Sequence, residues 1–442
     1  MSRDSSPRRV ADLISESVLV VNDGYRAKND ELASAGLPFA RAGNIDDGFQ
    51  FADADYFPEQ SLARVGNKVS RPDDVVFTSK GTVGRFAYVA DSTPRFVYSP
   101  QLCFWRALDR ERLHSRWLFY WMQSSEFQEQ CDGVKGQTDM ADYVSLRDQR
   151  AMSISLPPIE EQRAIGLLLG ALDDKIELNR RMNQTLESMA RAIFRSWFVD
   201  FDPVVAKAAG RWPFGMSADV VALFPDRFVE SPIGAIPEGW PTRSIYEFAH
   251  FVNGAPFNGS HFSPDRSGLP IVKIAELKYG ITEQTQFTTL GHDEKYRLAT
   301  GDILFSWSGS PETSIGTFVW SGGPAWLNQH IFRIAANRKE DHLWLYYCLS
   351  QLNDEFIEIA RNKQTTGLGH VTVADLKRLL VVAPSDGALA AFDAVVGPVH
   401  RKWFQNTLES RTLAALRDTL LPRLMSGELR VRDAEKLMGA HA

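Results

Sequence analysis

The sequence of 442 residues is poor in cysteine and has no long apolar run. Its three cysteines, Cys103, Cys131 and Cys348, lie far apart and include no CxxC pair. This argues against a disulfide framework and against a thiolate zinc site. No apolar stretch approaches the roughly 20 residues that span a bilayer, and the first residues lack the apolar core of a secretion signal. We therefore expect a cytoplasmic protein whose cysteines are reduced and structural.

The sequence also lacks the short motifs that bind common cofactors. It has neither GxxxxGK nor a GxGxxG that follows a strand, which argues against Walker-type phosphate sites and dinucleotide sites. It has no Asn/Asp-Pro-Pro-Tyr/Phe tetrapeptide, which holds the target amino group in DNA amino-methyltransferases, and no glycine-rich AdoMet loop. Its nine histidines lack metal-ligand spacing. We expect no metal site and no cofactor bound by this chain.

What the sequence does contain is an internal repeat, the first feature to seek in a long chain. GLPFARAGNI at 36–45 recurs as GLPIVKIAEL at 268–277, and WLFYWM at 117–122 recurs as WLYYCL at 344–349. Two further matches lie between and after these, in the same order and with nearly the same offset. Since 442 residues exceed what one hydrophobic core usually organises, we expect two duplicated copies, each with its own core.

Each copy has a globular part followed by a long helical part. Short β-type runs such as VVFT at 75–78 and ILFS at 303–306 alternate with Gly, Pro and Asn turns, which is typical of a compact α+β domain. Six prolines between residues 200 and 241 predict an extended connection. We therefore expect a first globular domain, a first helix, a linker, a second globular domain, a second helix and a tail at 1–157, 158–199, 200–240, 241–383, 384–428 and 429–442.

Both helical parts carry apolar residues at steps of three and four, which predicts a narrow seam of about 3.5-residue period. Such a seam favours an antiparallel coiled coil between the two helices, with one globular domain at each end and a pseudo-two-fold axis. The alternative is two separate helices, each buried in its own domain. The expected seam residues are Leu172, Ile176, Asn179, Leu186, Met189 and Ile193 in the first helix and Trp403, Asn406, Leu413, Leu416 and Leu420 in the second.

Three polar, glycine-rich or basic segments recur in both copies and are candidates for binding DNA. Their Ser, Thr, Lys and Arg side chains can contact phosphate, and glutamine can form two hydrogen bonds with adenine. For any one residue, a solvated turn is the alternative. The segment at 78–85 contributes Ser79, Lys80, Thr82 and Arg85, with Ser308 and Ser310 as counterparts; the second contributes Lys135, Gln137 and Thr138, with Lys363, Gln364, Thr365 and Thr366; the third contributes Arg41 and Lys273.

One short string imitates a catalytic site. Pro264-Asp265, followed by Glu276-Leu277-Lys278 on an expected strand, resembles the PD…ExK pattern, in which two carboxylates hold Mg²⁺ and a lysine assists the attacking water. A stand-alone Mg-dependent DNA nuclease is therefore an alternative. The repeat argues against it. Aligning residue 36 of the first copy with residue 268 of the second places Asn44 opposite Glu276 and Asp46 opposite Lys278, so the first copy lacks these groups.

Four separated segments together resemble the specificity subunit of type I restriction-modification systems. They are LPPIEEQRAIGLLLGALDDKIELNRRMNQTLESMARAIFRSWFVDFDP, SPIGAIPEGW, LNQHIFRI and LLPRLMSGELRV, and the resemblance extends over essentially the whole chain. One departure is that the first copy lacks the IPEGW lead-in of the second, which leaves the start of the first domain open.

The resemblance implies two target-recognition domains, each reading one half of a bipartite sequence in double-stranded DNA, joined by two conserved antiparallel helices. It also implies that the chain is not an enzyme. Two methyltransferase subunits would bind AdoMet and methylate adenine N6, and two restriction subunits would use ATP and Mg for translocation and cleavage. A second alternative is a scaffold that binds methyltransferase without reading DNA sequence.

Overall fold

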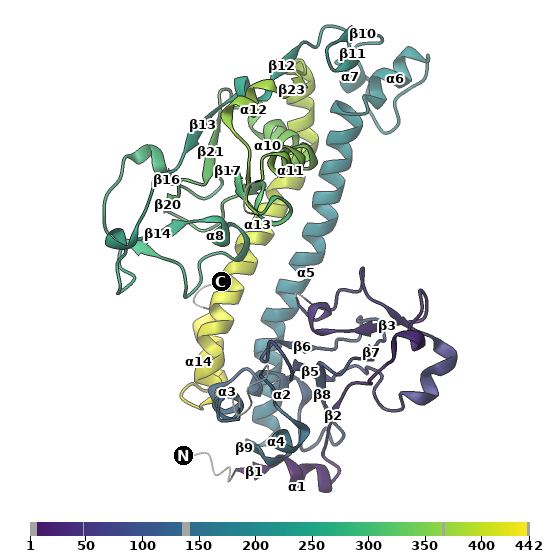
Figure 1. The fold of residues 1–442 in the computed structure, drawn as a ribbon, viewed down its shortest axis with the longest axis vertical. Helices are drawn as coiled ribbons and strands as arrows, with labels where there is room; N and C mark the ends of the chain where they lie inside the picture. The colour runs from purple at the N-terminus through teal and green to yellow at the C-terminus, as the bar shows by residue number, and fades with distance from the viewer. Residues whose placement is uncertain (1–6, 47, 135–141, 365–366, 440–442) are drawn as a thin grey trace. The chain divides into compact units, whose positions relative to one another are not determined.

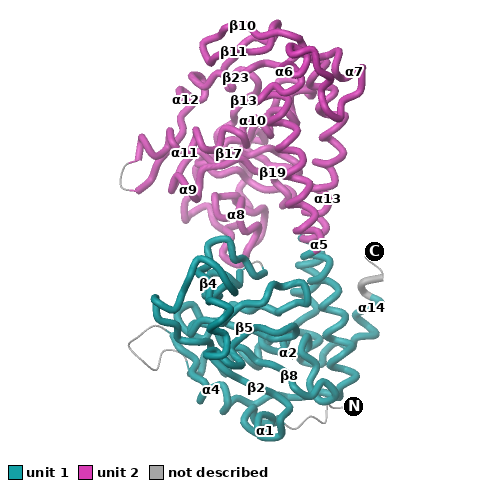
Figure 2. Tube along the Cα trace, turned by 90° about the vertical axis from the view of Figure 1, so that its right-hand side faces the viewer, with its two compact units in different colours: residues 1–177, 411–442 teal, residues 178–410 magenta. Residues whose placement is uncertain are grey.

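The computed structural model describes residues 7–46, 48–134, 142–364 and 367–439 (Figure 1). The chain forms two compact units (Figure 2). Unit 1 comprises residues 1–177 and 411–442, and unit 2 comprises residues 178–410. The division falls within two long helices, so each unit contains part of both.

Unit 1 is built on two small sheets. The first is antiparallel throughout, with the order β2 (Leu19–Asp23), β8 (Leu102–Ala107), β5 (Val75–Thr78) and β6 (Phe86–Tyr88). In the second, β3 (Leu37–Ala40) pairs antiparallel with β4 (Tyr56–Phe57) and parallel with β7 (Val97–Tyr98). The remaining elements are β1 (Arg8–Arg9), which pairs with β9 (Ser153–Ile154), and the helices α1 (Val10–Ser15), α2 (Ser115–Trp121), α3 (Ser125–Asp132) and α4 (Leu146–Ala151).

Unit 2 repeats this strand order. Its antiparallel sheet has the order β13 (Ala249–Asn253), β21 (Ile331–Ala336), β17 (Ile303–Ser306) and β19 (Gly316–Val319). The second sheet has the order β15 (Phe287–Thr288), β14 (Leu269–Val272), β20 (Ala325–Leu327) and β16 (Arg297–Leu298), again with one parallel pair, β14 and β20. The counterparts of the remaining elements are β12 (Thr242–Ser244), β23 (Leu380–Val382), α10 (Asp341–Gln351), α11 (Asn353–Asn362) and α12 (Val373–Arg378).

Both cores lie between the antiparallel sheet and the aromatic helices that follow it. In unit 1, Trp105 of β8 contacts Trp121 of α2 with ring centroids 5.8 Å apart, and both rings contact Phe127 of α3. In unit 2, Phe305 of β17 contacts Phe356 of α11 at 4.7 Å. Aromatic side chains bury large apolar areas, so the short helices after β8 and β21 close each core.

The long helices are α5 (Ile159–Phe198) and α13 (Asp386–Met425), each of 40 residues. They begin and end within three residues of the expected bounds. In unit 2 they run antiparallel, because the Asn179 side-chain amide donates to Glu409 Oε2 at 2.9 Å while Phe194 contacts Phe392 at 5.9 Å. In unit 1, Arg417 of α13 forms an ion pair of 2.8 Å with Asp173 of α5. The pairing of the helices is confirmed within each unit, and the fold is the expected α+β repeat.

The predicted seam residues are buried or half-buried except at one position. Leu172, Asn179, Asn406 and Leu420 are buried, and Ile176, Leu186, Ile193, Trp403, Leu413 and Leu416 are half-buried. Met189, however, is 49% exposed, and its neighbour Ala190 is buried instead. A straight α-helix has 3.6 residues per turn, so a pattern of period 3.5 drifts by about 20° per heptad away from the buried face.

The segment after α5 is folded, which corrects the expected extended linker. It contains α6 (Asp202–Ala208), α7 (Ala218–Val221) and a hairpin of β10 (Phe228–Ser231) and β11 (Gly234–Pro237). Phe224 and Trp240 pack against each other near Trp197. Burial of these rings offsets the conformational entropy that the proline-rich segment loses when it becomes ordered. After α13, the tail likewise folds into α14 (Val431–Gly439), and Ala434 lies in the core of unit 1.

Candidate nucleic-acid interface

In unit 1 the first predicted segment pairs with residues that follow the second predicted segment in the sequence. The main chain after β5 pairs with residues 142–144: Gly81 N–H donates to Asp142 O at 3.0 Å, and Val144 N–H donates to Ser79 O at 2.9 Å. These bonds place Lys80 opposite Tyr143 as an antiparallel bridge. Gly81 has φ +84°, a conformation that favours glycine. The loop at 78–85 is thus tied to residues 142–144, which follow the second predicted segment in the sequence.

The same pairing occurs in unit 2. Here β18 (Ser308–Gly309) pairs with β22 (Gly369–His370), which places Ser308 opposite His370. Val371 N–H donates to Trp307 O at 2.8 Å, the counterpart of the bond between Val144 and Ser79. Segments separated by about 60 residues in each copy therefore form one surface per unit.

The third segment also lies at this surface. In unit 1, the guanidinium of Arg85 reaches Asp46 Oδ2 at 2.6 Å, and Gln101 Oε1 accepts from Ala42 N–H at 3.3 Å. In unit 2, the third segment forms α8 (Ile274–Tyr279), and a Cβ added at Gly309 would lie 3.6 Å from the side chain of Ile274. In each unit the structure therefore brings together the first segment, the third segment and the residues that directly follow the second, at 142–144 in unit 1 and 369–371 in unit 2.

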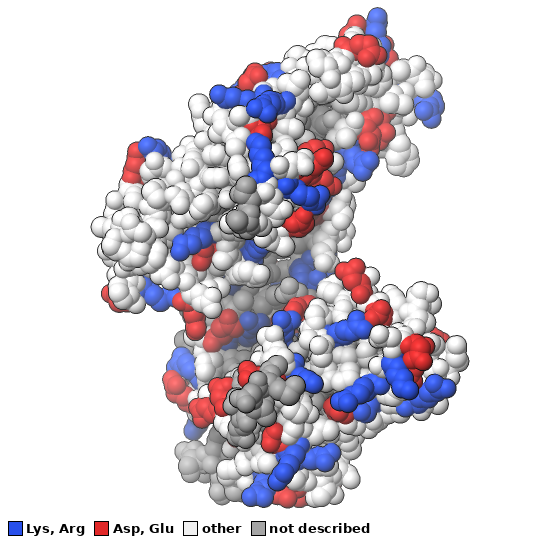
Figure 3. Space-filling view, in the orientation of Figure 1, with Lys and Arg blue, Asp and Glu red and all other residues white. Residues whose placement is uncertain are grey.

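Two of the four predicted cations in the first and third segments are paired with carboxylates. Arg41 pairs with Asp55 at 2.6 Å and Arg85 with Asp46 at 2.6 Å. Figure 3 likewise shows Lys and Arg interspersed with Asp and Glu on the visible face. Within the described part of the chain Lys80 forms no ion pair, and Lys273 Nζ lies 4.9 Å over the ring of Phe262. Lys80 and Lys273 are therefore the better placed of these four cations to neutralise phosphate.

Lys363 is fixed inside its own loop. Its ammonium lies 2.6 Å from Asp375 Oδ1, and Asp375 is only 6% exposed. Burial alone would raise the pKa of Asp375, but the hydrogen bonds from Lys363 and Thr372 outweigh it and lower the pKa. Lys363 thus holds the loop before β22 on α12.

The predicted hydroxyl and amide residues differ in exposure. Thr82, Ser310 and Gln364 are exposed, and Gln364 donates to Gly367 O at 2.8 Å. The structure corrects the expectation that Ser79 contacts DNA. Ser79 is 1% exposed and its hydroxyl accepts from the Cys103 thiol, so its side chain lies beneath the surface. Five predicted residues lie outside the described ranges: Lys135, Gln137, Thr138, Thr365 and Thr366.

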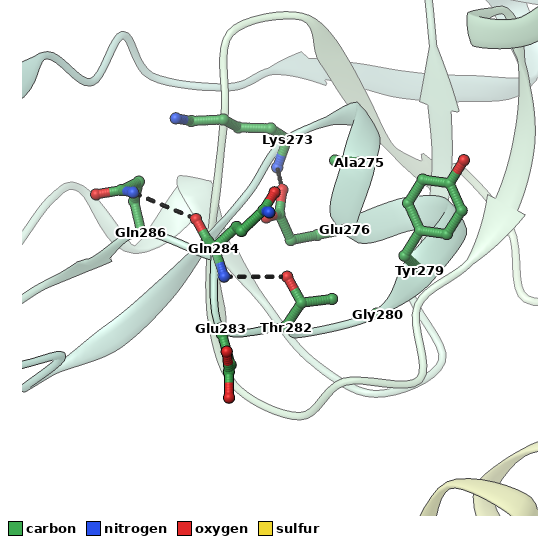
Figure 4. Close-up of a pocket in the computed structure, with 9 residues that line it drawn as sticks. All are labelled: Lys273, Ala275, Glu276, Tyr279, Gly280, Thr282, Glu283, Gln284 and Gln286. Atoms are coloured by element: carbon green, nitrogen blue, oxygen red, sulfur yellow. Dashed lines mark hydrogen bonds between the residues drawn. The ribbon is translucent and has the colours of Figure 1, made fainter. Parts of the chain in front are cut away.

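A groove of about 710 Å³ runs beside α8 in unit 2 (Figure 4). Lys273, Tyr279, Gln284 and Gln286 are among its lining residues. Tyr279 is 76% exposed. The lining also includes Glu276 and Glu283, so the groove combines one cation with aromatic, amide and acidic groups. Its amide side chains are of a type that contacts DNA base edges.

Comparison with known proteins identifies the family. The family model described as type I restriction modification DNA specificity domain matches residues 17–188 and again 237–388. These two matches cover most of the chain. It belongs to the type I restriction-modification DNA specificity family.

Individual relatives of this family are distant. The type I restriction enzyme HindI specificity subunit of Haemophilus influenzae is 25% identical over 323 residues, which cover 63% of this chain and 69% of the relative. The MjaIX specificity subunit of Methanocaldococcus jannaschii is 23% identical over 385 residues, covering 85% and 82%. The type I S subunit from M. genitalium has the same fold, with a TM-score of 0.60, 14% identity and 96% of both chains covered.

The nuclease alternative has no support from the family or from the structure. Glu276 lies on α8, not on the expected strand, is 7% exposed, and accepts from the Lys273 N–H at 2.9 Å (Figure 4). Asn44 in the first copy makes the same bond, accepting from the Arg41 N–H at 2.7 Å. Hydrogen bonds from Ser267 hold the carboxylate of Asp265 and lower its pKa. Among the described residues no three His, Cys, Asp or Glu side chains could hold a metal ion.

Sequence reasoning did not single out Tyr143 and His370, which also lie on this candidate surface. Each is held opposite a predicted residue by main-chain pairing. The repeat contains the signal that could have found them, because DYVSL at 142–146 aligns with GHVTV at 369–373.

In the part of the chain that the structure describes, no helix is both long and apolar enough to cross a membrane.

Proposed function

We propose that this chain reads the DNA target of a type I restriction-modification complex, with each copy of the repeat recognising one half of a bipartite sequence. One observation carries the proposal. The two family-model matches, 17–188 and 237–388, fall on two units with the same strand order but different surface side chains. A symmetric homodimer presents the same patch twice, whereas this duplicated chain can read two different half-sites.

The chemistry belongs to partner subunits. Two methyltransferase subunits bind AdoMet and methylate adenine N6, and two restriction subunits use ATP and Mg. The chain itself is non-catalytic and supplies recognition. The repeat supports two like partners, because each copy contributes one helix of 40 residues, α5 or α13, and like partners can bind like elements.

Methylation sequencing tests the proposal. A host with intact methyltransferase and restriction genes should carry N6-methyladenine in one bipartite motif when this gene is present and lose that motif when it is deleted. Replacing residues 1–157 by those of a relative should change one half of the motif only. A change in both halves, or in neither, contradicts the two-domain reading.

Two other outcomes identify the alternatives. Cleavage of DNA by the purified chain with Mg²⁺ alone would favour a nuclease. Capture of methyltransferase without any sequence-dependent shift on DNA would favour a scaffold.

A further inference from the structure

In both units the main chain pairs in the same way at the candidate surface, but the paired residues carry different side chains. Lys80 stands opposite Tyr143 in unit 1, and Ser308 stands opposite His370 in unit 2. The flanking bonds match as well, with Val144 to Ser79 at 2.9 Å and Val371 to Trp307 at 2.8 Å. One scaffold therefore presents a lysine and a tyrosine in one unit and a serine and a histidine in the other.

The pair in unit 1 is accessible and its cation is available. Lys80 is exposed, Tyr143 is 47% exposed, and no carboxylate of a described residue pairs with the Lys80 ammonium. In this respect Lys80 differs from Arg41 and Arg85, whose charges are matched.

Both pairs are held rigidly. Gly81 and Gly309 directly follow Lys80 and Ser308, and both have positive φ, +84° and +126°. Gly369 lies against α11, where an added Cβ would be 2.2 Å from Ala360 O, so this position is restricted to glycine. Main-chain pairing and glycine geometry thus fix where the four side chains start.

We propose that Lys80 with Tyr143, and Ser308 with His370, are the residues that make the two units select different bases. The inference deepens the proposed function and rests on it. A lysine ammonium only donates and suits the O6 and N7 acceptors of guanine in the major groove, whereas serine accepts or donates to several bases. The half-site read by unit 1 therefore contains a guanine that Lys80 contacts, and unit 2 lacks this requirement.

Phosphate contact by Lys80 is the competing role, and it makes a different prediction. Loss of a phosphate contact weakens binding about equally for all sequences, whereas loss of a base contact relaxes one position. Sequence preference, not overall activity, is the informative readout.

The experiment transfers the pair between units in the complete complex with its methyltransferase subunits. The variant Lys80→Ser with Tyr143→His gives unit 1 the pair of unit 2, and Ser308→Lys with His370→Tyr does the reverse. Arg95→Ser is the matched control, because Arg95 is an exposed cation of unit 1 that belongs to none of the three predicted segments. Methylation sequencing of host DNA reads both half-sites at once.

For the Lys80/Tyr143 variant we expect the preference for guanine at one position of one half-site to fall by about 5- to 100-fold. The other half should stay unchanged, and Arg95→Ser should match the wild type. An unchanged motif, or a uniform loss in both halves, overturns the proposal. If the wild type itself directs no bipartite motif, the proposed function fails instead.

A second measurement tests the proposal if the double variant fails to fold or to assemble with its methyltransferase subunits. Gel shifts with the Lys80→Ala complex on duplexes that carry each base in turn along the half-site give the same preference without methylation. A retained guanine preference at every position overturns the proposal, and a preference lost at one position supports it.

Discussion

The side-chain amide of Asn406 on α13 donates a hydrogen bond to Oδ1 of Asn183 on α5, 3.0 Å away. Its counterpart in the repeat is the bond of 3.3 Å from Asn179 to Ser410 Oγ. Asn179 and Asn406 are both fully buried. Buried polar contacts between helices are worth little net stability but can specify which residues face each other.

Asn406→Leu should lower the free energy of unfolding by about 1 kcal/mol, because Asn183 loses its donor. Chemical denaturation of the whole chain measures the change. Gln405→Leu, at an exposed position of the same helix turn, is the control and should change stability by no more than about 0.5 kcal/mol. Equal effects of the two substitutions would contradict the role of this contact.

Substitutions at Ala190 and Met189 test which of these two residues lies in the seam between α5 and α13. Ala190→Gln should cost about 2 kcal/mol or more, because it forces a polar side chain into a fully buried position. Met189→Gln should be within about 0.5 kcal/mol of the wild type, since this side chain is 49% exposed. Thermal melts of both variants decide the matter, and a larger loss for Met189→Gln would restore the pattern predicted from sequence.

The variant Glu276→Gln distinguishes a helix-capping role of Glu276 from a metal-binding role. Glutamine keeps an acceptor for the Lys273 N–H, so the melting temperature should stay close to that of the wild type, with and without Mg²⁺. Glu276→Ala should cost about 1 kcal/mol, and Asn44→Ala should cost a similar amount in unit 1. A Mg²⁺-dependent rise in melting temperature that Glu276→Gln abolishes would argue for a metal site.

His400 makes stability depend on pH. Burial, with His342 and Arg401 nearby, lowers its pKa to about 4, below the roughly 6.5 of an unfolded histidine. Between these values the unfolded chain binds a proton that the folded chain does not, so stability falls as pH falls from 6.5 to 4 and then levels. The loss should reach about 3 kcal/mol.

Denaturation at several pH values measures this effect. His400→Gln should reduce the dependence between pH 4 and 6.5, to which His342, whose pKa burial also lowers, still contributes. The same change at the exposed His330 is the control. Identical slopes for the wild type and His400→Gln would exclude the explanation.

The duplicated fold could be predicted because its signals are local or repeated. The seam of α5 and α13 is visible as three- and four-residue steps, and duplicated strings such as WLFYWM and WLYYCL mark equivalent elements. Helix bounds were therefore accurate, and the error at Met189 came from treating a 3.6-residue period as 3.5.

The candidate surface was less predictable because it depends on pairing between distant segments. Nothing near Lys80 in sequence indicates that Tyr143 lies opposite it. Glu276, Leu277 and Lys278 were expected on a strand, but the hydrogen bond from the Lys273 N–H to Glu276 begins a helix there. In the linker, prolines suggested extension, whereas Phe224 and Trp240 supplied enough apolar surface to fold it.

The main-chain pairing beneath Lys80, Tyr143, Ser308 and His370 has a bearing on how this protein can evolve. Hydrogen bonds made by peptide groups do not depend on the side chains that the paired residues carry. Mutations at these exposed or half-exposed positions therefore cost little stability. A lineage can sample new side chains there, one unit at a time, while the core and the long helices α5 and α13 remain intact, so changes in preference need not pass through unfolded intermediates.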